Sequence, residues 1–303
     1  MSHDYVSGFF AVIGRPNVGK STLVNALVGE KVAIVSDLPQ TTRNRIMGVV
    51  CRENAQIVLL DTPGIHKPRN KLGEAMMRSI DEALDGVDGL MFVADATEIC
   101  GESNAAKRSA TLALLHVYEN HQLPKVLVVN KIDRIRPQPL IQLLDELKDE
   151  PVDDIIPISA LTGENLNRLG DLLFSKLLPG PQFFPDDMMT DQSERFHIAE
   201  LIREKALHRL REEVPHGIGI EVLSIAQANG KTEIHANVLV EKSSHKGIVI
   251  GKHGSMLGEI GTEARADIER MLGQKVDLRL WIKVREDWRN DERALDDLGY
   301  GKH

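Results

Sequence analysis

Eight residues near the N-terminus have the types and spacing of a phosphate-binding loop. Gly14-Arg-Pro-Asn-Val-Gly-Lys-Ser21 satisfies the pattern G-x-x-x-x-G-K-[ST]. Its glycines allow backbone N–H groups to turn inward around an anion, at a helix N-terminus whose dipole favours negative charge. Lys20 is placed to reach the β- and γ-phosphates of a nucleoside triphosphate, and the Ser21 hydroxyl to ligate Mg²⁺. We therefore expect nucleotide contacts from Gly14, Arg15, Pro16, Asn17, Val18, Gly19, Lys20, Ser21 and Thr22.

A second motif, Asn130-Lys131-Ile-Asp133, predicts which base is bound. A carboxylate at Asp133 can accept hydrogen bonds from both N1–H and the 2-amino group of guanine. Adenine would leave that carboxylate unpaired, which costs about 1–3 kcal/mol for a buried acceptor. Asn130 and Lys131 are expected to brace the base and its loop. In Ser159-Ala160-Leu161, the backbone N–H of Ala160 is placed to meet guanine O6. Together these residues predict a guanine nucleotide.

A third motif, Asp61-Thr62-Pro63-Gly64, is expected to contact Mg²⁺ and the γ-phosphate. Asp61 would hold Mg²⁺ through water, and the Gly64 N–H would sense the γ-phosphate. Taken alone, Pro-Gly is also common in ordinary turns.

The segment between the phosphate loop and Asp61 contains two adjacent threonines, in Pro39-Gln-Thr41-Thr42-Arg43. One of them is expected to cap the γ-phosphate and ligate Mg²⁺, in the manner of an ordered switch loop. We assign this role to Thr42, with Thr41 as the alternative. The predicted Mg²⁺ ligands are therefore Ser21, Thr42 and Asp61.

Strands and helices must position these motifs, and the first half of the chain alternates between them. Short runs, mostly apolar on both faces, predict the strands of a parallel sheet covered by helices. Ser21–Val28 and Leu140–Leu147 have helical spacing. The alternation predicts a doubly wound α/β fold, and it gives the phosphate loop the strand-then-helix context that a chance glycine turn would lack. The predicted strands are Phe9–Ile13, Ile57–Leu60, Gly89–Ala94, Val126–Val129 and Ile155–Ile158.

A proline-rich stretch, Pro179–Pro185, can continue neither a helix nor a central strand. We expect a nucleotide-binding domain over residues 1–178, a linker over 179–192, and a second domain over 193–303. In the second domain Ile218–Ala226 and Thr232–Lys242 alternate apolar and polar residues around the hairpin signal Ala228-Asn-Gly-Lys231. Helical stretches are predicted at Phe196–Val214, just before Gly251, and at Gly258–Leu272, and a last strand is predicted at Val276–Val284. Together with the hairpin they predict a small α+β domain of order α-β-β-α-α-β.

The second domain carries a Gly-Lys-His-Gly loop, Gly251–Gly254, with Lys242 and Lys246 before it. Such a loop lets a nucleic-acid backbone come close, with a cation to meet phosphate. Alone the pattern is weak, because most G-x-x-G sequences are ordinary turns. The element order, however, resembles a type II KH domain, which implies binding of about four nucleotides of single-stranded RNA. The expected RNA contacts are Lys242, Lys246, Gly251, Lys252, His253 and Gly254.

Overall composition limits the kinds of partner. The net charge is −8 and the pI is near 5.8, so a broad positive coat is excluded and nucleic acid must be met by a local basic edge. Two cysteines, Cys51 and Cys100, cannot build a disulfide framework, which fits a reducing compartment. Neither a signal-peptide pattern nor an apolar run long enough to span a bilayer is present. We expect a cytoplasmic protein, with peripheral contact at the inner face of the cell membrane left open.

The four ordered motifs, the KH-like domain and the tail Trp288–Tyr300 together resemble the Era family of P-loop GTPases, over nearly the whole chain. The resemblance implies GTP and GDP as ligands, Mg²⁺ as cofactor, and hydrolysis of GTP. It further implies binding near the 3′ end of 16S rRNA and a role in assembly of the 30S ribosomal subunit. We expect a monomer that does not bind DNA. Leu161 stands where many GTPases have lysine, which is expected to soften base stacking without altering the choice of guanine.

Hydrolysis is only partly assigned by these motifs. Many GTPases have a glutamine directly after Gly64 to orient the attacking water, whereas this chain has Ile65. In the resembled group an asparagine at the position of Asn17 is associated with a K⁺ ion that acts where an arginine finger would. The alternative is that Asn17 only stabilises the loop. The residues expected to act in hydrolysis are Lys20, Asn17, Thr42 and Gly64.

Three other kinds of protein share some of these motifs. A tRNA-modifying GTPase would place its nucleotide domain inside a larger helical domain and end in a reactive cysteine, whereas this chain ends Gly-Lys-His303. A metabolic kinase is disfavoured by the guanine motif. A signalling GTPase whose second domain binds protein or membrane, with Gly251–Gly254 a structural turn, stays open as the alternative function.

Overall fold

The computed structural model describes residues 5–65, 67–101, 104–228 and 230–301, and the chain forms two compact units. The first unit contains Met1–Ala33, Thr42–His66 and Met77–Asp191. The second contains Gln192–His303 together with two segments from the N-terminal part of the chain, Ile34–Thr41 and Lys67–Met76. Each unit is described separately below.

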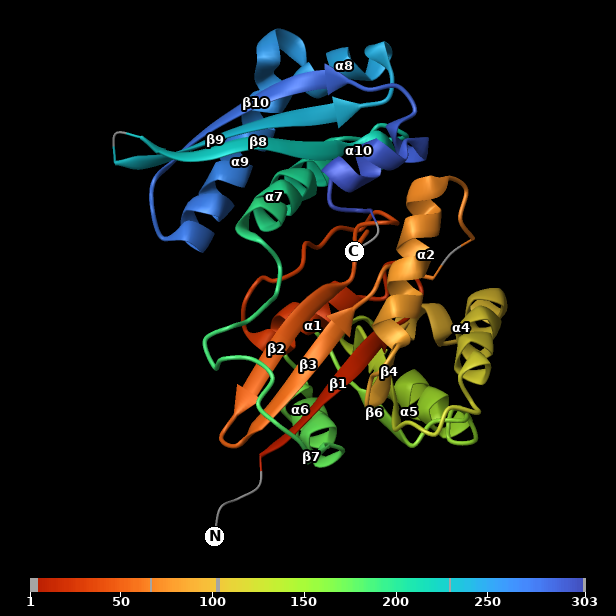
Figure 1. Ribbon diagram of the computed structural model, residues 1–303. Helices are drawn as coiled ribbons and strands as arrows, with labels where there is room; N and C mark the ends of the chain where they lie inside the picture. Colours follow the sequence, from red (N-terminus) through yellow and green to blue (C-terminus); the bar gives the residue numbers. More distant parts are fainter. Residues whose placement is uncertain (1–4, 66, 102–103, 229, 302–303) are drawn as a thin grey trace. The chain divides into compact units, whose positions relative to one another are not determined.

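A mostly parallel sheet organises the first unit (Figure 1). Its strand order is β2-β3-β1-β4-β5-β6, and β7 pairs with β1. Strands β2 and β7 run antiparallel to their partners, and the other pairs are parallel. The strands are β1 (Val6–Ile13), β2 (Ile46–Arg52), β3 (Ala55–Asp61), β4 (Gly89–Asp95), β5 (Lys125–Asn130), β6 (Asp154–Pro157) and β7 (Leu178–Pro179).

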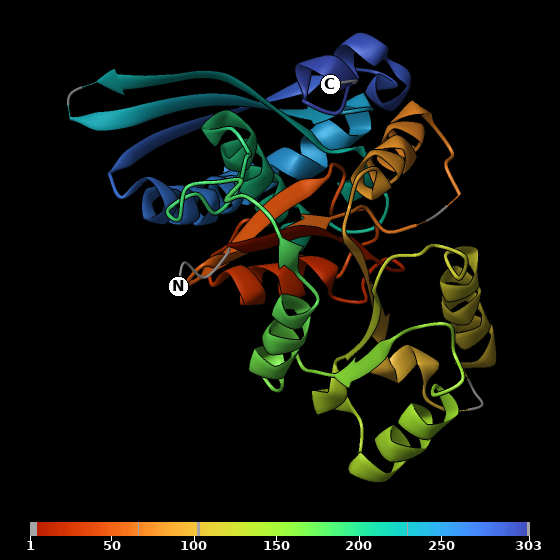
Figure 2. The same ribbon diagram turned by 60° about the horizontal axis from the view of Figure 1, so that its bottom comes forward.

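Helices cover both faces of this sheet (Figures 1 and 2). Alternate residues of β1 separate the two cores: Phe10 and Val12 pack with α1 and α6, whereas Ala11 and Ile13 pack with the side of α4 and α5. The predicted doubly wound α/β fold is therefore confirmed. The five predicted strands are all present, and the sequence missed β2 and the short β7. The helices are α1 (Lys20–Val28), α2 (Lys71–Leu84), α3 (Ala96–Ile99), α4 (Ala105–Val117), α5 (Pro137–Glu146) and α6 (Leu166–Ser175).

The second unit has the predicted α-β-β-α-α-β order, followed by one further helix. Its sheet has the order β10-β9-β8, with β9 antiparallel to β8 and parallel to β10. One face of the sheet packs against α7 and α9 through residues such as Ile202, Val238 and Ile268. The elements are α7 (Glu194–Arg209), β8 (Gly219–Ala228), β9 (Lys231–Val240), α8 (Ser243–Ile250), α9 (Ser255–Leu272), β10 (Val276–Val284) and α10 (Glu292–Asp297).

Two details of the second unit differ from expectation or fall outside the described chain. Helix α7 ends at Arg209 rather than continuing to Val214, because Leu210 is extended and Glu212 has a positive φ of 57°. Asn229, in the predicted hairpin turn, lies outside the described residues. Across the part of the chain that the structure describes, no helix is both long enough and apolar enough to cross a membrane.

Candidate nucleotide site and nucleic-acid groove

The backbone of the loop between β1 and α1 depends on glycines at two positions. Asn17 and Gly19 have positive φ values of 63° and 97°. A Cβ on Gly19 would lie 2.4 Å from the Asn130 side-chain nitrogen, and one on Gly14 would lie 2.5 Å from the Val93 carbonyl oxygen. Larger residues at these two positions would therefore displace the neighbouring base-binding motif and β4. The glycines permit both the turn of the loop and its close packing.

Lys20, the first residue of α1, is buried at the centre of this loop. Its Nζ donates to the carbonyl oxygens of Gly14 and Arg15, each at 3.1 Å. Burial lowers the pKa of the Lys20 ammonium to about 8, and the nearby Asp61 carboxylate offsets part of that effect. The side chain thus places a positive charge where the loop N–H groups gather, as expected for a group that contacts the β- and γ-phosphates.

Three oxygen-bearing side chains meet beside Lys20. Ser21 Oγ donates to Asp61 Oδ2 at 2.6 Å and lies 2.8 Å from Thr42 Oγ1. The other carboxylate oxygen, Asp61 Oδ1, is buried and has no hydrogen-bond partner among the described residues. Burial raises the pKa of the Asp61 carboxyl to about 6, although Lys20 and the Ser21, Thr42 and Thr62 hydrogen bonds act to lower it. This oxygen set fits Mg²⁺, which binds through few protein oxygens together with phosphate and water.

The structure distinguishes between the two candidate threonines. The hydroxyl of Thr41 is engaged with Ser36 Oγ and the Leu38 carbonyl oxygen, both at 2.6 Å. The hydroxyl of Thr42 instead lies against Ser21, at the predicted metal site. Of the two hydroxyls, that of Thr42 is therefore the one beside the predicted metal site, and its role as a ligand stays a prediction.

The Asp61–Gly64 run lies directly against the phosphate loop. Thr62 Oγ1 donates to the Val12 carbonyl oxygen at 2.7 Å, and a Cβ on Gly64 would lie 2.8 Å from Pro16. Ile65 donates its backbone N–H to Gly14 O at 3.4 Å, while its side chain packs against the apolar core. Ile65 therefore contributes packing at the position where other GTPases have a water-orienting side chain.

The base-binding motif joins three loops through Asn130. Its Nδ2 donates to the Val18 carbonyl oxygen at 3.0 Å, and its Oδ1 accepts from the backbone N–H groups of Lys131 and Ala160. Asp133 accepts a hydrogen bond from Ser159 Oγ at 2.6 Å. Because the Ala160 N–H already donates to Asn130 here, its recognition of guanine O6 stays a prediction.

A carboxylate that sequence reasoning missed belongs to this region. Asp95, the last residue of β4, is 6% exposed and forms an ion pair with Lys131 at 2.6 Å. Lys131 also donates to the Asn17 carbonyl oxygen at 2.6 Å and has a positive φ of 65°. Asp95 thus orients the lysine that links the base motif to the phosphate loop. The sequence feature that could have identified Asp95 is its place directly after the apolar run Gly89–Ala94.

In the second unit, the Gly251–Gly254 loop joins α8 to α9. Gly251 has φ 72° and ψ 178°, and a Cβ there would lie 2.7 Å from Met256, so glycine is required. His253 and Gly254 also have positive φ, of 54° and 81°. Lys252 and His253 are exposed at the tip, and Lys242 and Lys246 are exposed at the start and on the outer surface of α8. The structure thus places all six predicted RNA contacts in one segment of this unit.

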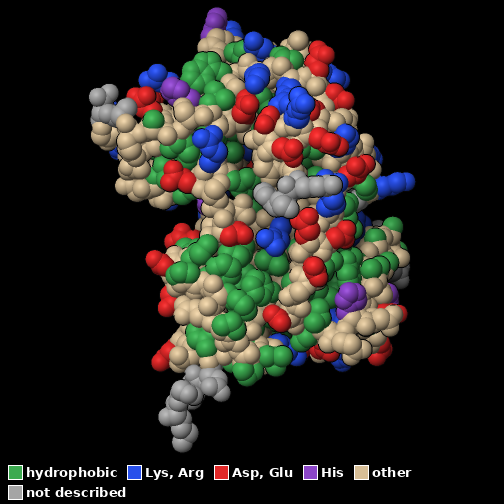
Figure 3. Space-filling model, in the orientation of Figure 1, with side chains coloured by type: hydrophobic (Ala, Val, Ile, Leu, Met, Phe, Trp, Pro, Cys, Tyr) green, Lys and Arg blue, Asp and Glu red, His purple; other side chains and the backbone are tan. Residues whose placement is uncertain are grey.

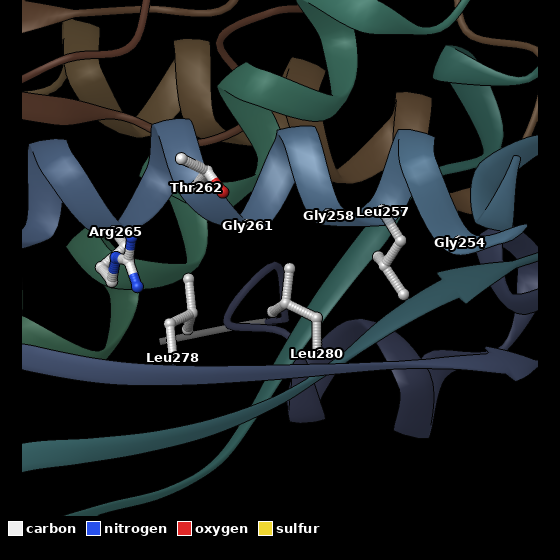
Figure 4. Close-up of a pocket in the computed structure, with 8 residues that line it drawn as sticks. All are labelled: Gly254, Leu257, Gly258, Gly261, Thr262, Arg265, Leu278 and Leu280. Atoms are coloured by element: carbon white, nitrogen blue, oxygen red, sulfur yellow. The ribbon is translucent and has the colours of Figure 1, made fainter.

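A groove of about 280 Å³ begins at this loop and runs between α9 and β10. Figure 4 shows Leu278 and Leu280 pointing from β10 toward α9, with Gly254 at one end of the groove and Arg265 at the other. No atom lies within 4 Å of the place a Gly258 Cβ would occupy, so this glycine keeps the groove open. Sequence reasoning predicted the loop but not the groove. The lining residues are Gly254, Leu257, Gly258, Gly261, Thr262, Arg265, Leu278 and Leu280.

Two family models match this chain, one in each half. A model described as 50S ribosome-binding GTPase matches residues 9–131, and a KH domain model matches residues 213–289. The GTPase Era of Alkaliphilus metalliredigens is 47% identical over 299 residues, which covers 98% of this chain and 99% of that protein. The GTPase Era of Clostridium botulinum (strain Eklund 17B) is 44% identical over 300 residues, with the same coverage.

Two solved structures resemble the whole chain. A crystal structure of Era in complex with MgGDPNP and nucleotides 1506–1542 of 16S ribosomal RNA is 38% identical, with a TM-score of 0.90, and covers 98% of this chain and 100% of that one. A variant of Aquifex aeolicus Era bound to GDP and AlF4⁻ is also 38% identical, with a TM-score of 0.89 and the same coverage. The chain therefore belongs to the Era family of GTPases.

Proposed function

We propose that this GTPase is a switch that binds single-stranded RNA near the 3′ end of 16S rRNA and acts in assembly of the 30S ribosomal subunit. The observation that carries the proposal is the groove between α9 and β10, which starts at the Gly251–Gly254 loop. A related structure holds a fragment from that part of 16S rRNA, which supports the choice of target.

Hydrolysis rests on residues of the first unit that hold charge in place. Lys20 binds the β- and γ-phosphates and stabilises the charge that develops as the γ-phosphoryl group leaves. Ser21, Thr42 and Asp61 would hold Mg²⁺, which supplies further neutralisation of phosphate charge when bound. Asp61 must be ionised for this role, and its pKa of about 6 means that it is ionised at neutral pH. Asp133 selects guanine, and its hydrogen bond from Ser159 fixes the carboxylate.

We propose K⁺ as a second cation, positioned by Asn17. The Ile65 side chain packs into the core, so another group must stabilise the transition state. The loop at Asn17 has a left-handed backbone and is tied to Lys131 through the Asn17 carbonyl. The GTPase rate of the wild type should be higher in K⁺ than in Na⁺, and Asn17→Ala should remove the difference. Equal wild-type rates in the two salts would contradict the proposal.

The groove fits single-stranded RNA because of its size and its lining. Apolar side chains from β10 form its floor, and glycines on α9 leave room for flat bases. The loop at its end exposes Lys252 and a tightly turned backbone, which suits a sugar–phosphate chain. Duplex RNA is read instead by wide surfaces that span many base pairs, and a groove of about 280 Å³ is too small for that.

The test is to crosslink RNA to the GTP-loaded protein in cells and sequence what is captured. We expect enrichment of the 3′ end of 16S rRNA for the wild type, and loss of capture for Gly251→Asp and Gly254→Asp. Gly86→Asp is the matched control for Gly254→Asp, because both glycines have a positive φ with open surroundings and Gly86 lies in the first unit. GTP binding should be unchanged in all three variants. Capture of random RNA, or of no RNA, would contradict the proposal and favour a protein-binding role for the second unit.

A further inference from the structure

The sheet of the second unit has a face turned away from α7 and α9, and that face carries an exposed tryptophan. Alternate side chains of a strand point to opposite faces. Leu278, Leu280 and their even-numbered neighbours on β10 pack toward the core, so Arg279, Trp281 and Lys283 lie on the other face. Trp281 is 47% exposed, and among the described residues it is the largest apolar side chain that faces solvent.

A neighbour holds the Trp281 ring in place without covering it. His235 of β9 is in register with Arg279 and lies on the same face. The two rings meet edge to face, with centroids 5.3 Å apart and an interplanar angle of 80°. Edge-to-face contacts of this kind fix ring orientation. Trp281 is therefore a positioned aromatic platform rather than a loose surface side chain.

Two exposed cations flank Trp281 along β10. The Arg279 and Lys283 side chains are 53% and 49% exposed, and they pair with Asp277 and Glu221 respectively. The Arg279–Asp277 pair is exposed on both sides, and such pairs contribute about 0–1 kcal/mol to stability, so a phosphate can replace Asp277 readily. Glu221 is 20% exposed and also accepts from Asn237, while Lys283 keeps half of its side chain open to a phosphate. Figure 3 shows hydrophobic side chains on the second unit with Lys, Arg, Asp and Glu side chains around them. An aromatic ring between two available cations is the arrangement with which proteins bind single strands, by stacking a base and contacting its flanking phosphates.

The face that carries Trp281 and the groove share one strand, β10. In the order β10-β9-β8, strand β10 lies at the edge of the sheet. Its Leu278 and Leu280 form the groove floor, and Arg279 and Trp281 lie on its reverse side. A KH groove holds only about four nucleotides. We propose that Trp281, Arg279 and Lys283 form a second RNA subsite, which stacks a base of the single strand after it leaves the groove and passes round β10. The proposal rests on RNA binding by the groove.

Tryptophan fluorescence tests the stacking directly. The chain has two tryptophans, and the other, Trp288, is fully buried and donates to the Gly217 carbonyl oxygen. The probes are a single-stranded RNA of about four nucleotides, which fills the groove, and one about three times as long. We expect the longer RNA to quench wild-type fluorescence and the shorter one to bind with little quenching. Trp281→Phe should show no quenching with either.

The RNA affinities of variants at position 281 distinguish base stacking from simple apolar contact. Trp281→Leu should bind the longer RNA about ten-fold more weakly and the shorter RNA as the wild type does. Trp281→Phe should retain most of the affinity, because it keeps an aromatic face. Lys283→Gln and Arg279→Gln should weaken only the longer RNA, and more so at low salt. Ile141→Ala, which removes a similarly exposed apolar side chain from the first unit, should change neither affinity.

Several results would overturn the subsite. The first is that Trp281→Leu binds the longer RNA with wild-type affinity. The second is that Trp281→Leu and Trp281→Phe lose the same affinity for the longer RNA. The third is that Trp281→Leu loses the same affinity for both RNAs. Thermal unfolding of each variant checks that the second unit remains folded, and the two cation variants test the subsite without altering Trp281. Failure of the groove itself has a different signature, because Gly254→Asp would then bind both RNAs as the wild type does.

Discussion

The nucleotide site and the RNA groove are built on opposite principles. In the first, polar side chains are buried and bonded to one another, so that Asn130 alone connects three loops. In the second, glycines on α9 and leucines on β10 leave a shaped space, with Thr262 and Arg265 as its polar side chains. A site built from hydrogen-bonded polar side chains selects its ligand by the positions of donor and acceptor atoms, whereas an open groove selects a class of ligand by its shape. Mutations should accordingly have large and specific effects in the nucleotide site, and graded effects in the groove.

The largest effect is expected from removing the phosphate-binding charge. Lys20→Ala should lower the GTP hydrolysis rate about 100- to 1,000-fold, because a buried donor to the developing charge is lost. Binding of a short RNA to the groove should be unchanged. Lys148→Ala, at a lysine that is 69% exposed and pairs with Asp145, is the control for removal of a cation. Hydrolysis by Lys20→Ala at the wild-type rate would break the distinction drawn between the two sites.

Asp61→Asn should stabilise the nucleotide-free protein while weakening its retention of Mg²⁺. The folded-state pKa of about 6 is raised above the ordinary value of 3.8, so the folded chain keeps a proton that the unfolded chain releases. The stability from this proton is present below about pH 4 and is lost as the pH rises through 6. The variant should therefore gain up to about 3 kcal/mol over the wild type between pH 4 and pH 7.

Urea unfolding at the two pH values, without nucleotide, measures this gain. Asp145→Asn, at a carboxylate whose side chain is 71% exposed, is the control substitution. If the free energies of unfolding of the wild type and Asp61→Asn differ by the same amount at pH 4 and pH 7, burial of an ionised Asp61 does not lower the stability of the wild type.

Asp133→Ala should lower GTP affinity about 10- to 100-fold, since charged hydrogen bonds to the base are lost and the Ser159 hydroxyl loses its acceptor. The preference for GTP over ATP should shrink by the same factor, which competition between the two nucleotides measures. A uniform loss for both nucleotides would mean that Asp133 only supports the loop.

The smallest effect is predicted in the groove, where stability and binding should move in opposite directions. Gly258→Ala should raise stability by about 0.5–1 kcal/mol, because alanine favours a helix and its Cβ meets no atom within 4 Å. The same methyl group narrows the groove, so RNA affinity should fall a few-fold. Gly247→Ala in α8 also adds a methyl group in open space but does not line the groove, and it should change stability only.

The two sites also differ in how far the sequence could predict them. The nucleotide motifs each lie within a few residues after a strand, so their positions follow from local order along the chain. Thr42 and Thr41 could not be separated, because adjacent residues differ only in which way the folded backbone turns them. The groove forms only when α9 packs against β10, whose residues are distant from the Gly251–Gly254 pattern along the chain. A Cβ on Gly261 of α9, for example, would lie 3.5 Å from the Leu280 side chain.

The elements themselves show the same limit. Strand β10 was predicted with its observed bounds, because one face is apolar and the other charged. Strand β2 was missed, since its sequence is interrupted by Gly48 and its pairing is fixed by the hairpin with β3. The end of α7 was misplaced because apolar residues continue beyond Arg209 in an extended backbone. Local periodicity predicts an element, while its ends depend on backbone turns.

Burial of Lys20 beside Asp61 has a consequence for the lifetime of the protein. At neutral pH both groups are charged, and each has a pKa displaced mainly by loss of water rather than by its partner. Such a pair destabilises a chain that has no ligand to complete it. A nucleotide present at 100 times its dissociation constant adds about 2.7 kcal/mol to stability. The first unit should therefore resist proteolysis better as the concentration of guanine nucleotide rises relative to its dissociation constant.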